Sequence, residues 1–213
     1  MLLEPIQGEA GILIPPADYL PAVRDITTRH SVLFITDEIQ SRLGRTGATF
    51  QCDNVGVVPD LYLLGKALGG IVPVSAVVGN ADILGVLGAG EHGSTFGGNP
   101  LAAAVGSAVV GLLTTGEYQE RARVMGARLA TRLERPVGSG VVAVRSAGRW
   151  AGIDIDPSLA TGRQVCELLM SHGGLAKDTH GSTICLAPPI VITADDTDFA
   201  VDQLEAVLLE MYG

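Results

Sequence analysis

The sequence has 213 residues, of which 47% are hydrophobic and 17% charged, and its formal net charge is −9 at pH 7. This composition indicates a globular chain with a buried core, and the negative charge argues against binding to nucleic acid or to anionic membranes. The three cysteines lack CxxC spacing and the N-terminus lacks a secretory signal, so we expect no disulfide framework, no metal site and a cytoplasmic location.

The first half of the chain alternates short strand patterns with helical ones. The apolar runs and their Gly, Pro, Asp and Asn boundaries predict a strand end over 1–5, a helix over 17–30, and strands over 31–36, 61–64 and 74–78. This alternation favours an open, mostly parallel α/β sheet, whose ligands gather beyond the carboxyl ends of the strands. Because the N-terminus resembles the middle of a strand, we also expect a segment that precedes it.

The second half has a different pattern. The apolar stretch 101–113 is too short to span a membrane and predicts a helix buried in a core or in a subunit interface. After it we expect an α+β unit, with helices over 117–134, 162–172 and 196–212, strands over 141–145 and 150–155, and short strands near 176 and 184. We therefore predict two domains, 1–115 and 116–213.

Two residues that follow predicted strands suggest a cofactor site. Asp37 comes directly after the first buried strand, and Lys66, one of only two lysines, lies in Leu-Leu-Gly-Lys-Ala-Leu-Gly-Gly. This layout is typical of a pyridoxal 5'-phosphate (PLP) site, in which the lysine forms a Schiff base and the acid pairs with the pyridine nitrogen. The apolar flanks of Lys66 predict a half-buried side chain. The alternatives are that Asp37 caps the next helix and that Lys66 is a surface lysine beside a turn.

A glycine-rich segment, Gly-Glu-His-Gly-Ser-Thr-Phe-Gly-Gly-Asn-Pro over 90–100, precedes a helix that Pro100 is expected to open. Its glycines, hydroxyls and backbone amides suit a phosphate group. Glycine-rich turns are common, so this segment indicates a phosphate site only in combination with Asp37 and Lys66.

Together these segments resemble the class III (ornithine aminotransferase-like) PLP-dependent aminotransferases, within fold type I. The resemblance extends over essentially the whole chain and rests on residues 4–9, 37–40, 45–47, 59–60, 64–68, 90–100 and 187–189. Segments 90–100 and 175–181 are most similar to the ornithine-type members. The resemblance implies the carboxyl-terminal part of the large PLP-binding domain, followed by the small α+β domain.

The resemblance also implies roles for residues of the first domain. Lys66 would carry the cofactor and move the proton between substrate and cofactor. Asp37 would pair with the pyridinium, Gln40 would hydrogen-bond the ring hydroxyl, and Ile39 would pack against one face of the ring. Thr95 would reach the cofactor phosphate of a second subunit, which implies a homodimer-type interface.

The sequence departs from the family at several points. Family members are about twice as long, and the missing portion would precede residue 1, which implies a separate N-terminal half as partner. Glu9 would lie in the substrate pocket as a gate paired with an arginine, but Cys185 occupies the position of that arginine. Arg42 stands where the family has a small residue, and we expect it to offset part of the missing charge.

The implied reaction is transfer of the δ-amino group of L-ornithine to 2-oxoglutarate, giving glutamate-5-semialdehyde and glutamate. Cys185 leaves two alternatives open. In the first, the chain is a non-catalytic remnant. In the second, it is a class III aminotransferase that takes a different ω-amino donor or oxo acid.

Overall fold

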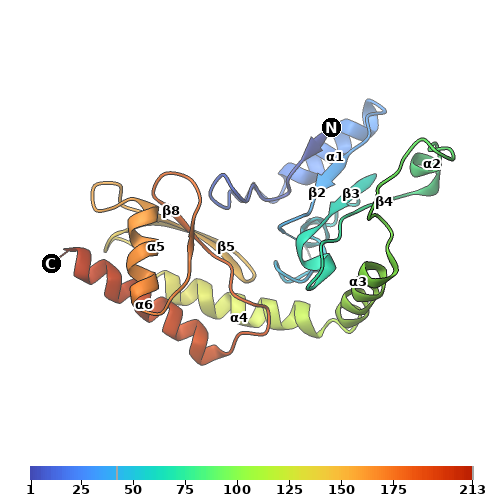
Figure 1. Ribbon diagram of the computed structural model, residues 1–213. Helices are drawn as coiled ribbons and strands as arrows, with labels where there is room; N and C mark the ends of the chain where they lie inside the picture. The colour runs from blue at the N-terminus through green and yellow to red at the C-terminus, as the bar shows by residue number, and fades with distance from the viewer. Residues whose placement is uncertain (42, 213) are drawn as a thin grey trace. The chain divides into compact units, whose positions relative to one another are not determined.

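The computed structural model describes residues 1–41 and 43–212, so Arg42 and the charge compensation expected of it lie outside the described residues. The described chain divides into two compact units (Figure 1). The first comprises residues 1–5, 15–43 and 48–117, and the second comprises residues 6–14, 44–47 and 118–213. Two short segments that the predicted domain 1–115 contains therefore belong to the second unit.

The first unit is built on a four-stranded sheet in the order β1-β2-β3-β4. Strands β1 (Leu2–Leu3), β2 (Ile35–Asp37) and β3 (Leu61–Leu64) are parallel, and β4 (Ala76–Gly79) is antiparallel to β3. A mostly parallel sheet was predicted and is present. The expected buried strand over 31–36 is wrong at its start, because the pairing begins at Ile35 and the side chains of Val32 and Leu33 are exposed.

The first unit also contains helices and 3-10 turns. They are α1 (Tyr19–Arg29), η1 (Gln51–Val55), η2 (Lys66–Gly69), α2 (Ala81–Leu84) and α3 (Pro100–Leu113). Pro100 opens α3 as predicted, and the Asn99 side chain caps it by accepting a hydrogen bond from the Ala102 amide at 2.9 Å. Only Ala102 and Gly106 of α3 are buried, so the helix is not buried in a core of this chain.

The second unit is an antiparallel sheet packed against three helices. Strands β5 (Val141–Ala147), β6 (Trp150–Ile155), β8 (Thr183–Leu186) and β7 (Lys177–Asp178) lie in that order. One face packs against α4 (Glu117–Leu133), α5 (Gly162–Ser171) and α6 (Ala194–Tyr212) in the larger apolar core. The opposite face carries Trp150 and Cys185, which pack with Ile6 and Ile12.

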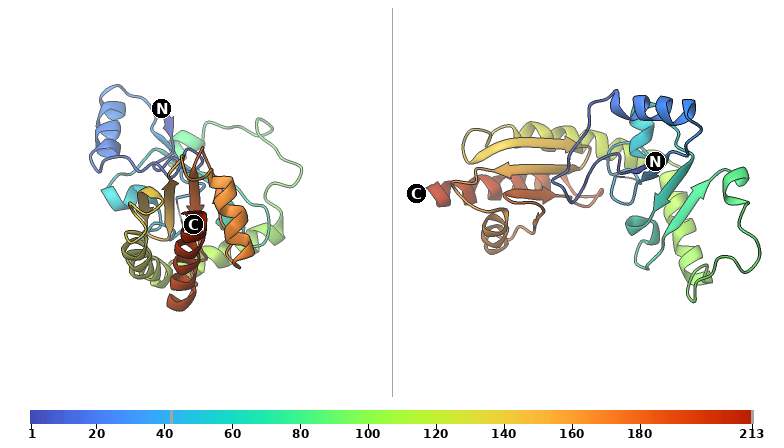
Figure 2. Two further views of the ribbon diagram at one scale, coloured as in Figure 1. Left: turned by 90° about the vertical axis from the view of Figure 1, so that its left-hand side faces the viewer. Right: turned by 90° about the horizontal axis from the view of Figure 1, so that it is seen from above.

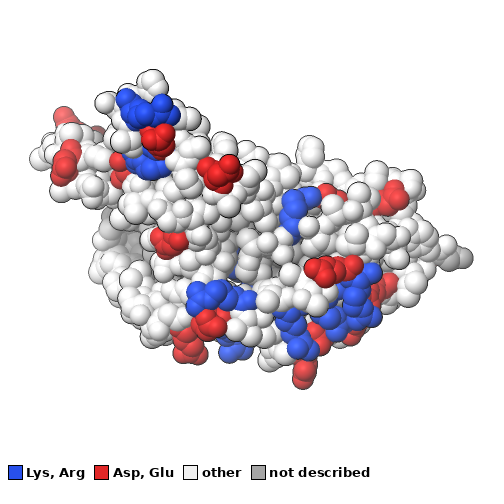
Figure 3. Space-filling model, turned by 180° about the vertical axis from the view of Figure 1, so that it is seen from behind, with Lys and Arg blue, Asp and Glu red and all other residues white. Residues whose placement is uncertain are grey.

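Helices α4 and α6 run side by side in the second unit (Figure 2). A ladder of ion pairs joins Arg128 and Arg132 of α4, and Arg135 two residues beyond its end, to Asp198, Asp202 and Glu205 of α6. In the view of Figure 3, blue and red side chains lie next to one another in groups, and much of the remaining surface carries no charge. No single described helix is long and apolar enough to cross a membrane; α3 and α4 pass that test only as a pair, which is bent by 64°.

Candidate functional site

The candidate cofactor residues lie at the carboxyl ends of two neighbouring parallel strands. Asp37 is the last residue of β2 and pairs in register with Leu63 of β3. Lys66 follows β3 at the start of η2, just after Gly65. The sequence predicted both placements, because parallel strands end at the same edge of a sheet and present the residues that follow them there.

Lys66 has an unusual backbone conformation. Its φ angle is +40°, a region that residues other than glycine rarely occupy and that tends to occur at functional positions. The expectation of a half-buried side chain is wrong for this structure, since Lys66 is exposed. The buried positions of η2 are taken by Leu68 and Gly69, so the lysine at the start of the turn is left facing outward.

Ile39 and Gln40 follow Asp37 in a half-buried turn. The Asp37 carboxylate accepts a hydrogen bond from the Ile39 amide at 2.9 Å, which fixes the start of this turn. The side chain of Ile39 lies 3.6 Å from where a Cβ atom on Gly65 would be. Ile39 therefore packs beside the residue that precedes Lys66, and Asp37, Ile39 and Lys66 belong to one neighbourhood.

Glu38 is a structural residue that sequence reasoning did not single out. Its side chain is fully buried and accepts hydrogen bonds from the Ser41 hydroxyl at 2.5 Å and from the Gln51 and Cys52 amides at 3.1 and 3.0 Å. These bonds connect the turn after β2 to η1 and so help to fix the backbone next to Asp37. The signal available in the sequence was a second acid directly after Asp37.

The glycine-rich segment forms an exposed turn ahead of α3. Thr95 lies in it and is exposed. The Ser94 hydroxyl accepts from the Gly97 amide at 3.0 Å, and the Asn99 side chain donates to the Phe96 carbonyl at 2.9 Å. A hollow of about 750 Å³ separates this turn from the segment before β4; it is lined by Val72–Ser75, Ser94, Phe96–Asn99 and Leu101–Ala103.

The residues expected at the substrate side belong to the second unit. Glu9 accepts a hydrogen bond from the ammonium of Lys177 at 2.8 Å, so its partner in this structure is a lysine, whereas the family resemblance implied an arginine at the position that Cys185 occupies. That hydrogen bond raises the pKa of Lys177. Cys185 is half-buried, and its sulfur accepts from the Trp150 indole at 3.3 Å. Burial raises the pKa of Cys185, so the thiol is neutral at physiological pH.

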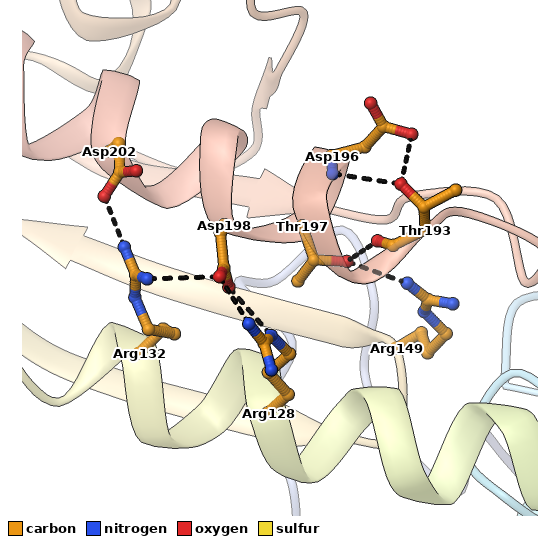
Figure 4. A network of polar contacts seen from close by, with 8 residues as sticks. All are labelled: Arg128, Arg132, Arg149, Thr193, Asp196, Thr197, Asp198 and Asp202. Atoms are coloured by element: carbon orange, nitrogen blue, oxygen red, sulfur yellow. Dashed lines mark hydrogen bonds and ion pairs between the residues drawn. The ribbon is translucent and has the colours of Figure 1, made fainter.

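Two arginines anchor the chain that follows Cys185. Arg45 donates to the carbonyls of Pro188 and Arg149, at 2.5 and 3.1 Å. Arg149 is fully buried; it donates to the Ile190 carbonyl at 2.8 Å and to the Thr197 hydroxyl at 3.2 Å in the first turn of α6 (Figure 4). Burial and the nearby Arg121 and Arg45 lower the pKa of Arg149 to about 10. Both arginines therefore shape the segment 186–193.

The first unit has a donor set that fits PLP. It offers a carboxylate for the ring nitrogen at Asp37, an apolar side chain at Ile39 and a primary amine at Lys66, all at one sheet edge. Gly65, directly before Lys66, has no side chain beside Ile39. The set contains the amine and the acid that a PLP site requires for the Schiff base and the ring nitrogen, with an apolar side chain beside them.

Comparison with known proteins agrees with this geometry. The family model described as aminotransferase class-III matches residues 1–208. An ornithine aminotransferase of Bacillus cereus (strain Q1) is 47% identical over 97% of this chain and 52% of its own length. An ornithine aminotransferase structure from Plasmodium yoelii superposes with a TM-score of 0.94 at 38% identity, over 99% of this chain and 56% of that chain.

A further solved structure has a related name. The acetylornithine aminotransferase of Elizabethkingia anophelis superposes with a TM-score of 0.92 at 41% identity, over 98% of this chain and 53% of that chain. The present chain thus spans about half the length of the relatives that it matches. The match to the family model over nearly the whole sequence and the agreement in fold lead to one conclusion: the chain belongs to the class III aminotransferases, with the mixed α/β fold of type I PLP-dependent enzymes.

Proposed function

We propose that this chain is the carboxyl-terminal portion of an ornithine-type aminotransferase, which transfers the δ-amino group of L-ornithine to 2-oxoglutarate. The observation that carries the proposal is the position of Asp37 and Lys66 at the ends of adjacent parallel strands. The similarity to ornithine aminotransferases over 97% of the chain supports it.

In this reaction PLP, when bound, supplies an electron sink for the carbon that loses a proton. The Asp37 carboxylate would stabilise a positive charge on the ring nitrogen by direct attraction. Ile39 would support one face of the ring, and Gln40 would donate a hydrogen bond to the ring oxygen. The amine of Lys66 would hold the cofactor at rest; once the substrate amine takes its place, the freed amine would accept the proton from the substrate carbon and return it on the cofactor side.

The proposal includes two partners. Because the relatives are about twice as long, an N-terminal half would complete the large domain. A second copy of the assembled pair would bring its cofactor phosphate to Thr95, which is exposed in its turn. The products would be glutamate-5-semialdehyde and glutamate.

The test is chemical labelling of the lysines. The purified chain, alone and co-expressed with the N-terminal half of the Bacillus cereus relative, is incubated with PLP, reduced with borohydride and digested for mass spectrometry. We expect the label on Lys66 and not on Lys177, which is the only other lysine in the sequence. Lys177→Arg keeps the label and Lys66→Arg removes it. Equal labelling of both lysines in both samples contradicts a PLP site and favours a non-catalytic remnant.

N-acetylornithine is the second candidate donor. The observation that favours it is the 41% identity to the acetylornithine aminotransferase of Elizabethkingia anophelis. Turnover of L-ornithine and of N-acetylornithine by the co-expressed pair discriminates the two. A higher kcat/KM for N-acetylornithine would replace the first candidate, with the same roles for Asp37 and Lys66.

A further inference from the structure

Lys66 has a backbone conformation that a lysine does not favour by itself. Its φ angle is +40°, where the Cβ atom of any residue other than glycine crowds the backbone. Such a conformation persists only where the surrounding structure leaves no relaxed alternative. The source of this restraint is found in the contacts of the residues that follow Lys66 in η2, up to Gly70, which ends the turn.

Leu68 fixes the middle of the turn. It is 8% exposed, and it packs in one apolar cluster with Val109 and Leu113 of α3. Its amide donates to the Gly65 carbonyl at 3.1 Å, so this hydrogen bond spans Lys66. A rotation of Lys66 to a negative φ would therefore break the hydrogen bond or pull Leu68 out of the cluster.

Two glycines fix the end of the turn. Gly70 has a φ angle of +56°, and a Cβ atom added to it would lie 3.2 Å from Val105 and 3.5 Å from Val109. A Cβ atom added to Gly69 would lie 3.0 Å from the Val74 amide nitrogen. The absence of side chains at these positions lets α3 and the segment before β4 approach the turn closely from two sides.

The face of α3 that is not exposed is the face that packs on this turn. The residues of the helix that are buried or half-buried recur three or four positions apart, which is the spacing of one helix face. They are Ala102, Val105, Gly106, Val109 and Leu113, and all other residues of α3 are exposed. A Cβ atom on Gly106 would lie 3.6 Å from the Leu68 carbonyl oxygen, which places the middle of this face directly against the turn.

The side chain of Lys66 takes no part in this packing. Lys66 is exposed, whereas Leu68 and Gly69 of the same turn are buried. The contacts with α3 thus restrain the backbone and leave the amine free. Because the backbone conformation of a residue determines where its side chain can point, the same contacts determine where the amine can reach.

From this arrangement we propose that Val105 is a positioning residue for the amine of Lys66, which acts by holding the end of the turn and so preserves the left-handed backbone of the lysine. The inference rests on the proposed function, since the amine is placed for a cofactor. A lysine released from this restraint would relax to a negative φ, and its amine would lose its fixed direction from the sheet edge at which Asp37 and Ile39 lie. Loss of a fixed geometry between reacting groups slows their reaction.

The conformation of Lys66 can be measured without the cofactor. The sequence has two lysines, so a chain labelled with ¹⁵N and ¹³C only in lysine gives two backbone amide signals, from Lys66 and Lys177. A positive φ brings the amide hydrogen close to the Hα atom of the same residue and gives a strong nuclear Overhauser effect between them. We expect this strong effect for Lys66 and a weaker one for Lys177, which lies in strand β7.

Val105→Ala is the test variant, because it removes the atoms that contact Gly70. The strong effect at Lys66 should weaken towards that at Lys177. In the chain co-expressed with the N-terminal half of the Bacillus cereus relative, the preference of PLP for Lys66 over Lys177 should fall about threefold. Val105→Ile, which keeps the branched side chain, should preserve both values.

The matched control is Val110→Ala, which makes the same change at a position of α3 that is 47% exposed. It should leave the amide signal of Lys66 and the labelling preference as in the parent chain. Cys52 reports on the integrity of the first unit, since it is fully buried in a different apolar cluster. Its reaction with a thiol reagent should be equally slow in all variants, which separates a loss of position from unfolding.

Three results would overturn the inference: no strong effect at Lys66 in the parent chain, an unchanged effect in Val105→Ala, or a weakened effect with unchanged labelling. Equal changes in Val110→Ala would show that the stability of α3, and not its contact with the turn, controls Lys66, and would overturn it too. The proposed function fails separately, when the parent complex labels both lysines equally. The amide signal of Lys66 then still decides whether Val105 holds its backbone.

Discussion

At the scale of single residues, Glu38 shows how a buried charge supports the site without belonging to it. Both of its carboxylate oxygens accept hydrogen bonds, from one hydroxyl and two backbone amides. A buried carboxylate is tolerated only when such donors replace the water that it loses. These hydrogen bonds of Glu38 hold the turn that follows β2, and they therefore help to fix the backbone of its neighbour, Asp37.

We predict that Glu38→Gln destabilises the first unit by roughly 2–4 kcal/mol, because an amide group would face backbone donors that need an acceptor. Cys52 provides the measurement, since it is fully buried and its amide binds Glu38. Its reaction with a thiol reagent should become faster in the variant, and the urea midpoint should fall. Asp25→Asn, an exposed acid of the same unit, is the control and should change neither value. Equal thiol reactivity in Glu38→Gln and the parent chain would contradict the prediction.

Sequence reasoning located Asp37 and Lys66 because their signal is local: each follows an apolar run. It did not foresee the contact of Glu9 with Lys177, because these residues are 168 positions apart and the strand register brings them together. The left-handed backbone of Lys66 also had no local signal, and its exposure agrees with the alternative of a surface lysine beside a turn, not with the half-buried side chain expected from its apolar flanks. The sequence was sufficient to locate reactive residues at the ends of strands, whereas the residues that pair across a sheet were found only in the folded structure.

At the scale of elements, the ladder between α4 and α6 depends on a shared spacing. Its arginines lie on α4 and two residues beyond its end, and its acids lie on α6; both sets are separated by four and then three residues, so the pairs meet across segments that run in the same direction. Figure 4 shows the first two pairs, Arg128 with Asp198 and Arg132 with Asp202. Arg128 binds both oxygens of Asp198, and Arg132 also approaches that carboxylate, at 3.5 Å.

The hydrogen bonds from Arg128 lower the pKa of Asp198 in the folded chain. A carboxyl whose folded pKa is depressed stabilises the fold above its unfolded pKa, about 3.9 for Asp, and this contribution is lost as the pH falls through the folded value. We therefore predict that the melting temperature of the second unit, followed by Trp150 fluorescence, drops below about pH 4. Asp198→Asn should lower it at pH 7 and flatten its dependence on pH.

The control for this prediction is Glu134→Gln, an exposed acid that follows α4 directly. It should leave both the melting temperature at pH 7 and the pH profile close to those of the parent chain. High salt should reduce the difference between Asp198→Asn and the parent, since the ladder is at the surface. An unchanged acid profile in Asp198→Asn would show that other carboxyls control the transition.

Most elements of both units were foreseen from hydrophobic period and boundary residues. The helices α4 and α5 agree with their predicted ranges to within one residue at either end, and α6 begins two residues early. The errors fall where burial depends on neighbours. Val32 and Leu33 are apolar but exposed, and α3 has an apolar sequence with few buried positions. The hydrophobic period of a sequence does not tell which apolar side chains are buried against other residues of the same chain.

At the scale of the whole molecule, the two units are interwoven in sequence. Residues 6–14 and 44–47 belong to the second unit, although the residues on either side of each segment in the sequence include parts of the first unit. Arg145 and Gly152 explain the first of these excursions, through their contacts with Gly11. No composition shift marks these segments, so a sequence-based boundary places them in the first domain. The fold class was predictable, and the assignment of these short segments was not.

The first unit exposes several large apolar side chains. Ile71 is 94% exposed and Phe96 is 82% exposed, and Val86 and Leu101 are also exposed. Exposed apolar patches mark protein interfaces or promote aggregation. We predict that the chain alone binds a hydrophobic dye and self-associates. Co-expression with the N-terminal half of the Bacillus cereus relative should yield a soluble complex in which dye binding falls.

Phe96→Ser and Ile71→Ser test whether these surfaces are responsible. Both variants should reduce dye binding by the chain alone, because each replaces an exposed apolar side chain with a small polar one. The control is Leu209→Ser, an exposed apolar residue of α6 in the second unit, which should have little effect on association with the N-terminal half. A monomeric chain that binds no dye and no N-terminal half would show that these apolar side chains are compatible with a free surface. A complex that forms equally well with Phe96→Ser and Ile71→Ser would place the interface elsewhere on the chain.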